Sequence, residues 1–190
     1  FGGNPDNTSL AYQIGVGMTG LSKPFDRFPV ALMDSEEYEG SVTSWSSGEY
    51  VAGSFRMREG LEDRFLPVLV HETVHGLNER SLEWDRTSST WFDEGTAKYV
   101  ESMASRYVNG EKRTRKLFSE DTVYYETRNG TRYRVTLPSS GSPDIFWDYY
   151  QNNRSFMKNW NPRKYPSQRD FGYAYSELII RNYVVNQNKS

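Results

Sequence analysis

Apolar residues recur at helical spacing in one stretch of the first half of the chain. They are separated by three or four positions, which places them on one face of an α-helix: Leu66, Val70, Val74 and Leu77. Proline is tolerated in the first turn of a helix, so Pro67 predicts that this helix begins between Glu62 and Pro67. The pattern indicates a helix with one face packed against a core.

A second helix is predicted over residues 91–109. Thr90, with Asp93 three residues later, resembles a capping box, and Gly110 is a typical helix stop. Four residues at helical spacing are expected on its buried side: Phe92, Tyr99, Met103 and Tyr107. The polar residues 81–89 predict a reversal that brings this helix alongside the first.

Short apolar or alternating runs predict strands before these helices. Residues 11–18 and 29–34 are apolar runs bounded by turn-forming residues, and each is expected to be a strand. Residues 50–58 alternate between apolar and polar side chains, as in a half-buried strand. A helical turn is expected at 35–40, and residues 1–8 are expected to form a loose lead-in.

The second half combines one hairpin with helical segments. An Asn-Gly pair at 129–130 lies between alternating runs at 123–127 and 131–137, which is a strong hairpin signal. Residues 144–160 form an aromatic-rich stretch that predicts a helix, and residues 173–185 predict a final helix. The pattern favours an α+β domain whose second half is mostly helical.

The first predicted helix carries His71, Glu72 and His75 in the pattern H-E-x-x-H, a metalloprotease signature when it lies on a helix. Four residues are just over one turn, so both imidazoles project from one face and can reach one metal ion. They are the only two histidines in the chain. Catalytic zinc takes three protein ligands and leaves one position for water, so another donor is needed. Glu94 is the best candidate.

Eighteen residues separate His75 from Glu94, and the surrounding residues form a longer pattern: Trp91, Glu94, Gly95, Ala97, Tyr99 and Glu101. At these positions the sequence resembles the gluzincin peptidases, the thermolysin and aminopeptidase N superfamily. In that family H-E-x-x-H is followed about 18 or 19 residues later by a glutamate ligand, often within W-x-x-E-G-x-A-x-Y-x-E. The resemblance covers about residues 66–108. It implies one zinc ion bound by His71, His75 and Glu94, with Glu72 as general base.

The resemblance also implies a zincin-like fold. We expect a single domain over residues 1–190, with a small mixed β-sheet and the active-site helix in a subdomain at 1–80. A mostly helical subdomain at 81–190 would carry the hairpin near 123–137, and a cleft would separate the two. The expected substrate is a peptide or protein. A non-catalytic zincin-like binding or cell-surface module is the alternative.

Two acidic residues of the second helix are candidates for supporting roles. Glu101 lies two turns beyond Glu94 on the same face and matches the last glutamate of the family pattern. A carboxylate bonded to the far nitrogen of a ligating histidine fixes its tautomer, and we expect this role for Glu101, with a surface ion pair as the alternative. Many aminopeptidase relatives carry Asn at the position of Asp93, and this departure favours a helix-capping role.

A peptidase of this type also needs a donor for the oxyanion of the tetrahedral intermediate. In the aminopeptidase branch this donor is a tyrosine at the start of a late helix. Tyr173 in the segment Tyr-Ala-Tyr-Ser resembles it, and Tyr175 is the second choice. The chain contains 14 tyrosines, so an ordinary core or cleft tyrosine remains the alternative reading.

In gluzincins, the strand before the zinc helix is the sheet edge that pairs with an extended substrate. The resemblance assigns this role to Ala52, Gly53, Ser54 and Phe55, and an ordinary edge strand is the alternative. Aminopeptidase N relatives hold the free amino terminus with a G-x-M-E-N segment. The corresponding residues 52–57 read AGSFRM and contain no glutamate, so an endopeptidase is expected.

Composition narrows the partners and the location. The net charge is −2, without a basic patch of the kind that nucleic-acid binding requires. No run of about 18 apolar residues is present, so no membrane span is expected within the chain. The absence of cysteine excludes disulfides and thiolate ligands. Four glycosylation sequons favour an extracytoplasmic or secreted protein: Asn7, Asn129, Asn153 and Asn188. A first residue other than Met is typical of a mature form or an excised ectodomain. The sequence does not indicate an oligomeric state.

Overall fold

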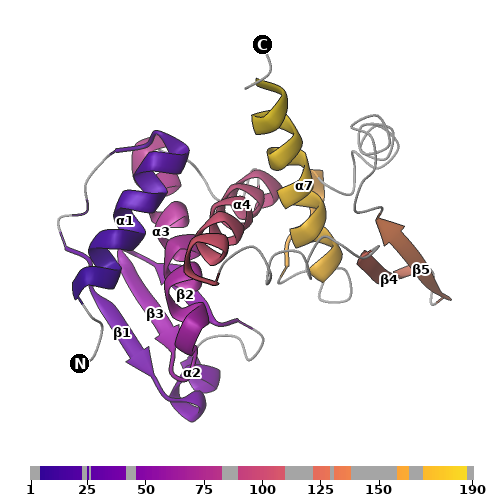
Figure 1. The fold of residues 1–190 in the computed structure, drawn as a ribbon. Coiled ribbons are helices and arrows are strands. Elements are labelled where there is room, and N and C mark those ends of the chain that lie inside the picture. The colour runs from indigo at the N-terminus through magenta and orange to yellow at the C-terminus, as the bar shows by residue number, and fades with distance from the viewer. Residues whose placement is uncertain are drawn as a thin grey trace. The chain divides into compact units, whose positions relative to one another are not determined.

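The computed structural model describes residues 5–22, 25, 27–41, 46–82, 90–109, 122–128, 131–137, 158–162 and 169–187. In these segments the chain forms helices, a three-stranded sheet and a two-stranded hairpin (Figure 1). The elements are α1 (Pro5–Thr19), β1 (Val30–Met33), α2 (Ser35–Ser41), β2 (Gly48–Val51), β3 (Ser54–Arg58), the 3-10 turn η1 (Glu62–Arg64), α3 (Phe65–Leu82), α4 (Thr90–Asn109), β4 (Thr122–Arg128), β5 (Thr131–Leu137) and α7 (Arg169–Gln187). The prediction of a mixed, largely helical fold with a small sheet is confirmed.

The chain divides into two compact units. One contains Phe1–Asp85 together with Val100–Gly110, and the other contains Arg86–Tyr99 together with Glu111–Ser190. Helix α4 contributes residues to both. The units have one boundary at 85 and another inside α4. The expected subdomains over 1–80 and 81–190 of a single domain remain predictions.

The sheet of the first unit is mixed, with strand order β1-β3-β2. Strand β1 is parallel to β3, with Val30 opposite Phe55, whereas β2 is antiparallel to β3, with Tyr50 opposite Phe55. The predicted strand at 29–34 is confirmed as β1, and the helical turn expected at 35–40 is confirmed as α2.

The prediction of one strand over residues 50–58 is wrong. Strand β2 ends at Val51 and β3 begins at Ser54, with Ala52 and Gly53 in the turn between them. The turn shifts the alternation by one position, so that Tyr50, Phe55 and Met57 are all buried. Because β3 is the central strand, Ser54 and Phe55 do not lie on a sheet edge, and the expectation that residues 52–55 form the sheet edge is wrong.

The prediction of a strand at residues 11–18 is also wrong, because this run belongs to helix α1. A short apolar run does not by itself distinguish a strand from a buried helix. The contact face of α1 carries small residues one turn apart, Ala11 and Gly15, and both are buried. A Cβ added at Gly15 would lie 3.0 Å from Leu77 Cδ1, so α1 packs directly on α3.

Helix α3 begins at Phe65, as predicted, and every residue from 66 to 78 is buried. Helix α1 covers one side, and an aromatic cluster covers another. In this cluster Phe28 stacks on Phe55 with ring centroids 4.2 Å apart, and Phe25 meets both Phe55 and Tyr50 edge-on. A Cβ at Gly76 would lie 2.6 Å from Phe25 Cζ, so glycine permits this close packing.

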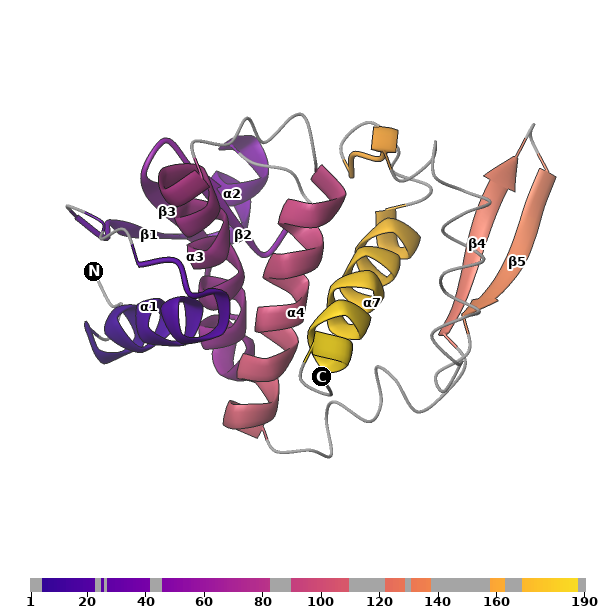
Figure 2. The same ribbon diagram turned by 90° about the horizontal axis from the view of Figure 1, so that it is seen from above.

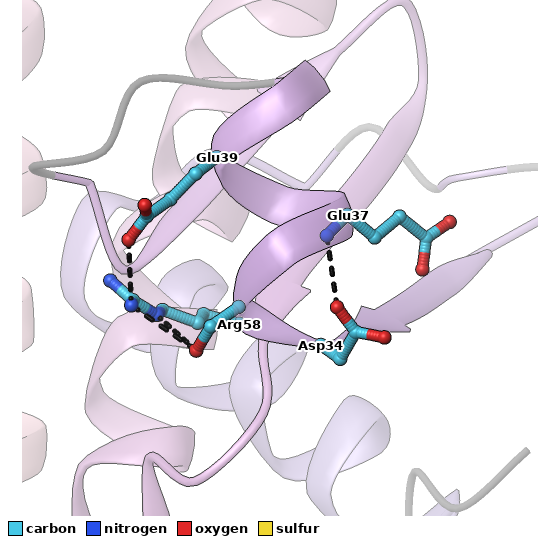
Figure 3. Close-up of polar contacts among 5 residues, drawn as sticks. Asp34, Glu37, Glu39 and Arg58 are labelled. Atoms are coloured by element: carbon cyan, nitrogen blue, oxygen red, sulfur yellow. Dashed lines mark hydrogen bonds and ion pairs between the residues drawn. The ribbon is translucent and has the colours of Figure 1, made fainter.

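Polar contacts cap helix α2 and join it to β3 (Figure 3). Asp34 Oδ1 accepts a hydrogen bond of 2.9 Å from the backbone N–H of Glu37, which caps the first turn of α2. Arg58 of β3 donates to Glu39 Oε1 at 2.9 Å and also to the hydroxyl of Ser35. These contacts fix the position of α2, which carries the buried Tyr38.

Helix α4 spans the predicted residues, but its buried side differs from the prediction. Tyr107 is 75% exposed, and Phe92, Tyr99 and Met103 are only partly buried. The buried stripe instead consists of smaller residues at helical spacing: Asp93, Ala97, Val100 and Ala104. Small side chains therefore mark the packed face of this helix, as they do in α1.

The second unit contains the hairpin and α7. Strands β4 and β5 pair antiparallel with Arg128 opposite Thr131, which confirms the predicted hairpin. Helix α7 confirms the final helix and begins four residues before the predicted start. The predicted helix at 144–160 falls outside the described residues except at its end, where Trp160 is buried against Gly172.

A close contact joins α7 to the first half of α4, which lies beside it (Figure 2). A Cβ at Gly95 would lie 2.7 Å from the carbonyl oxygen of Ser176. A larger residue at position 95 would push the two helices apart.

Across the described residues, no helix has the length and apolar character needed to cross a bilayer.

Candidate metal centre

His71, His75 and Glu94 form a cluster whose potential ligand atoms all lie within 4.8 Å of one another. His71 and His75 are 7% and 3% exposed, and Glu94 is partly buried. These are the three residues that the sequence predicted as ligands. A cluster of two imidazoles and a carboxylate could hold a metal ion.

The two imidazoles converge through their Nε2 atoms, which are 3.0 Å apart. Two ligands at zinc–nitrogen distances of about 2.0–2.1 Å on a tetrahedral ion lie about 3.3 Å apart. The rings cross at 81° with centroids 4.7 Å apart, so neither ring blocks the nitrogen of the other. The donor chemistry and the spacing of the imidazoles therefore fit one zinc ion.

Glu101 lies beside His71. Its Oε2 atom is 2.9 Å from His71 Nδ1, and the two side chains are 17% and 9% exposed. The sequence predicted a carboxylate at the far nitrogen of a ligating histidine, and the structure places Glu101 there rather than in a surface ion pair. With Nδ1 engaged by Glu101, Nε2 is the nitrogen directed at His75.

Glu72 is held by the sheet. Its Oε2 atom accepts a hydrogen bond of 2.8 Å from the backbone N–H of Tyr50 in β2, and its side chain is 6% exposed. Gly48 of the same strand lies close to it, because an added Cβ would be 3.1 Å from Glu72 Cγ. The carboxylate next to His71 is thus buried and oriented by a main-chain donor.

Tyr38 is a neighbour of Glu72 that the sequence did not single out. The side chain is fully buried in α2, and burial raises the pKa of its hydroxyl to about 12, with smaller contributions from the negative charges of Glu72 and Glu49. The Ser46 hydroxyl and the Arg58 charge oppose this shift. Tyr38 is therefore a neutral phenol in the ordinary pH range. No sequence motif marks this position.

Asp93 is buried in the first turn of α4, at 5% exposure, on the same stripe as Ala97 and Val100. Its position next to Glu94 points it to a different face of the helix, because consecutive helical residues are about 100° apart. The capping role of Asp93 remains a prediction.

The two tyrosines proposed as oxyanion donors have different surroundings. Tyr173 is partly buried, with its ring 5.3 Å from that of Trp160 and 5.4 Å from Lys98 Nζ. Tyr175 is completely buried. Tyr173 is the fifth residue of α7 rather than its first, and Lys98 is one turn after Glu94 on α4. The oxyanion role of Tyr173 or Tyr175 remains a prediction.

Comparison of the chain with models of protein families, with curated proteins and with solved structures finds no match. Function is therefore inferred from the residues and contacts of this chain.

Proposed function

We propose that this chain is a zinc-dependent metallopeptidase of the gluzincin type that cleaves internal bonds of peptides or proteins. The observation that supports this most is the cluster of His71, His75 and Glu94, with Glu72 adjacent to the first ligand on the same helix. A ligand cluster alone would suit a structural metal site. A buried carboxylate within the H-E-x-x-H segment adds a group that can accept a proton.

Zinc suits the proposed ligand set. Two histidines and one glutamate are the donor set of the thermolysin-type catalytic zinc site, in which the fourth position is left for water. A zinc ion bound there supplies Lewis acidity, which lowers the pKa of a bound water and polarises a carbonyl. We propose that His71 and His75 bind through Nε2, with Glu101 fixing the tautomer of His71.

In the proposed reaction Glu72 acts as general base and then as general acid. Its carboxylate accepts a proton from the attacking water, and the resulting carboxylic acid gives that proton to the leaving amine as the C–N bond breaks. The hydrogen bond from Tyr50 N–H to Oε2 orients the Glu72 carboxylate. Tyr173 is our proposed hydrogen-bond donor to the oxyanion.

Substrate class and location are part of the same proposal. The chain contains no G-x-M-E-N segment of the kind with which aminopeptidase N relatives hold a free amino terminus, which favours an endopeptidase. The sequons favour an extracytoplasmic protein that acts on peptide or protein substrates, and one of them, at Asn7, lies in the first turn of α1.

The decisive experiment compares wild type with Glu72→Gln. Both proteins are measured for bound zinc and for hydrolysis of an unfolded protein substrate. We expect about one zinc per chain in both, and loss of nearly all turnover in Glu72→Gln, because the amide is nearly isosteric but cannot accept the proton. Glu79→Gln, on the same helix and partly exposed, is the matched control and should keep full activity.

The possible outcomes separate the proposals. Wild-type protein that binds zinc without hydrolysing peptide bonds would favour the non-catalytic binding module. Equal turnover in wild type and Glu72→Gln would remove Glu72 from the mechanism. A chain refolded with zinc that retains none would contradict the metal assignment itself.

A further inference from the structure

The pairing of β2 with β3 determines the direction of the Tyr50 N–H. Val51 and Ser54 flank a two-residue turn and form the pair that exchanges backbone hydrogen bonds. The next pair, Tyr50 and Phe55, is then a non-hydrogen-bonded pair whose backbone groups point away from each other. Phe55 N–H accordingly donates to the carbonyl of Pro29 at 2.9 Å, on the side of β1. Tyr50 N–H must point outward from the side of β2 that faces away from β3.

This outward N–H is the donor to Glu72. The two residues are 22 positions apart, and the hydrogen bond of 2.8 Å is buried. The next outward-facing residue of β2 is Gly48, and its carbonyl accepts a hydrogen bond from the Ser46 hydroxyl. Main-chain groups that an added strand would use are therefore engaged within the chain itself.

Gly48 provides the space for this arrangement. A Cβ at this position would lie 2.8 Å from Val68 Cγ1 and 3.1 Å from Glu72 Cγ. Any side chain would therefore push β2 away from α3 or displace the side chains of Val68, Glu72 or Met57. Glycine allows the strand to lie against the helix at the turn that carries Glu72.

We infer that β2 positions the general base: the Tyr50 backbone N–H orients the Glu72 carboxylate, and Gly48 leaves the room that this contact requires. The Tyr50 N–H of β2 is then engaged by Glu72 and does not donate to the main chain of an extended substrate. The catalytic part of this inference rests on the proposed peptidase function. The contact between Tyr50 and Glu72 can be tested without any activity.

The first test is amide hydrogen exchange of the whole chain measured by NMR. Glu72→Ala removes the acceptor, so the Tyr50 amide should exchange about tenfold faster or more, as expected for the loss of one hydrogen bond to a charged group. Glu72→Gln retains an acceptor oxygen and should keep most of the protection. The Phe55 amide, bonded to Pro29, is the internal control and should be unchanged.

The second test is Gly48→Ala, with Gly40→Ala as the matched control because a Cβ at Gly40 would meet nothing within 4 Å. Gly48→Ala should retain zinc and KM while kcat falls about tenfold or more, since small misplacements of a catalytic group have large effects. Gly40→Ala should leave all three unchanged. If Gly48→Ala does not fold, Gly48→Ala combined with Val68→Ala relieves one clash and retains the contact with Glu72.

The outcomes of these tests are distinct from those of the proposed function. Unchanged Tyr50 exchange in Glu72→Ala, or full kcat in a folded Gly48→Ala variant, would overturn the positioning role. Absence of hydrolysis in wild type would contradict the peptidase proposal, whereas the exchange experiment would still decide whether β2 holds Glu72.

Discussion

Glu101 Oε2 lies 2.9 Å from Nδ1 of His71, while Nε2 of the same ring lies 3.0 Å from Nε2 of His75. One ring nitrogen of His71 is thus engaged by a carboxylate, and the other is directed at the second histidine. Because Nδ1 contacts Glu101, Nε2 is the nitrogen of His71 that could bind a metal. The contribution of Glu101 to metal affinity can therefore be measured by substitution.

Glu101→Ala is expected to weaken zinc binding by about 10–100-fold, because the tautomer and orientation of His71 are no longer fixed. Zinc affinity is measured by competition with a chelator of known affinity. The exposed Glu36 of α2 gives a control, Glu36→Ala, that should bind zinc as wild type does. Equal affinities in all three proteins would show that Glu101 is only a neighbour of His71.

Glu94→Ala is expected to lose zinc binding and, with it, hydrolysis, because two histidines alone leave the proposed site one ligand short. Metal content after dialysis is the primary measurement. Asp93→Asn preserves shape at the adjacent buried position and should retain the metal. Retention of zinc by Glu94→Ala with unchanged affinity would place the third ligand elsewhere.

Tyr173→Phe is expected to lower kcat about a hundredfold or more with little change in KM, because a donor to the oxyanion acts mainly in the transition state. Steady-state kinetics on a peptide substrate separate the two constants. Tyr183→Phe, at an exposed position of the same helix, is the control. A fall in kcat in Tyr175→Phe and none in Tyr173→Phe would move the role to Tyr175.

Tyr38 should make the protein sensitive to alkaline pH. Burial raises the pKa of Tyr38 from 10.0 to about 12, so the unfolded chain loses this proton at lower pH than the folded one. The contribution of Tyr38 to the free energy of unfolding is therefore fully present below pH 10. It falls by about 2–3 kcal/mol as the pH rises towards 12. Urea unfolding across this range should show that loss in wild type and not in Tyr38→Phe. Parallel pH dependences would contradict the shift.

Ala52 adopts a φ of 49° and Gly53 a φ of 82° in the turn between β2 and β3. Both central residues have positive φ, as in the type I′ turns that favour Asn-Gly. Ala52→Gly or Ala52→Asn should therefore raise the free energy of unfolding by about 0.5–1 kcal/mol, and Gly53→Ala should lower it. Equilibrium denaturation measures each change. A loss of stability in both Ala52 variants would contradict the strained turn.

The cluster of His71, His75 and Glu94 could be predicted from the sequence because its residues lie in two short motifs with characteristic spacing. The spacing of His71 and His75 places both on one face of α3, and the pattern around Glu94 gives the register of α4. The Glu72–Tyr50 contact could not be predicted, because it joins residues 22 positions apart and uses a main-chain donor that leaves no mark in the residue types.

The wrong predictions about the fold have two physical causes. In α1 and α4 the packed faces carry small residues such as Ala11 and Ala97, so a search for large apolar side chains selects the wrong structure or the wrong face. Between Val51 and Ser54 a two-residue turn changes the phase of the alternation without interrupting it visibly. A hairpin with Ala in place of the usual Asn or Gly is then indistinguishable from one strand.

The complete burial of residues 66–78 has a consequence for mutational scanning. A scan for retained protein abundance would show an uninterrupted block of intolerance along this segment, with Gly76 as sensitive as Val74 because it seats the ring of Phe25. Within that block, the sensitivity of His71 and His75 would be hidden among packing positions. A scan that measures metal binding would distinguish the two histidines from the residues that only pack. It would also identify Glu101, a partly exposed residue that lies outside the segment 66–78.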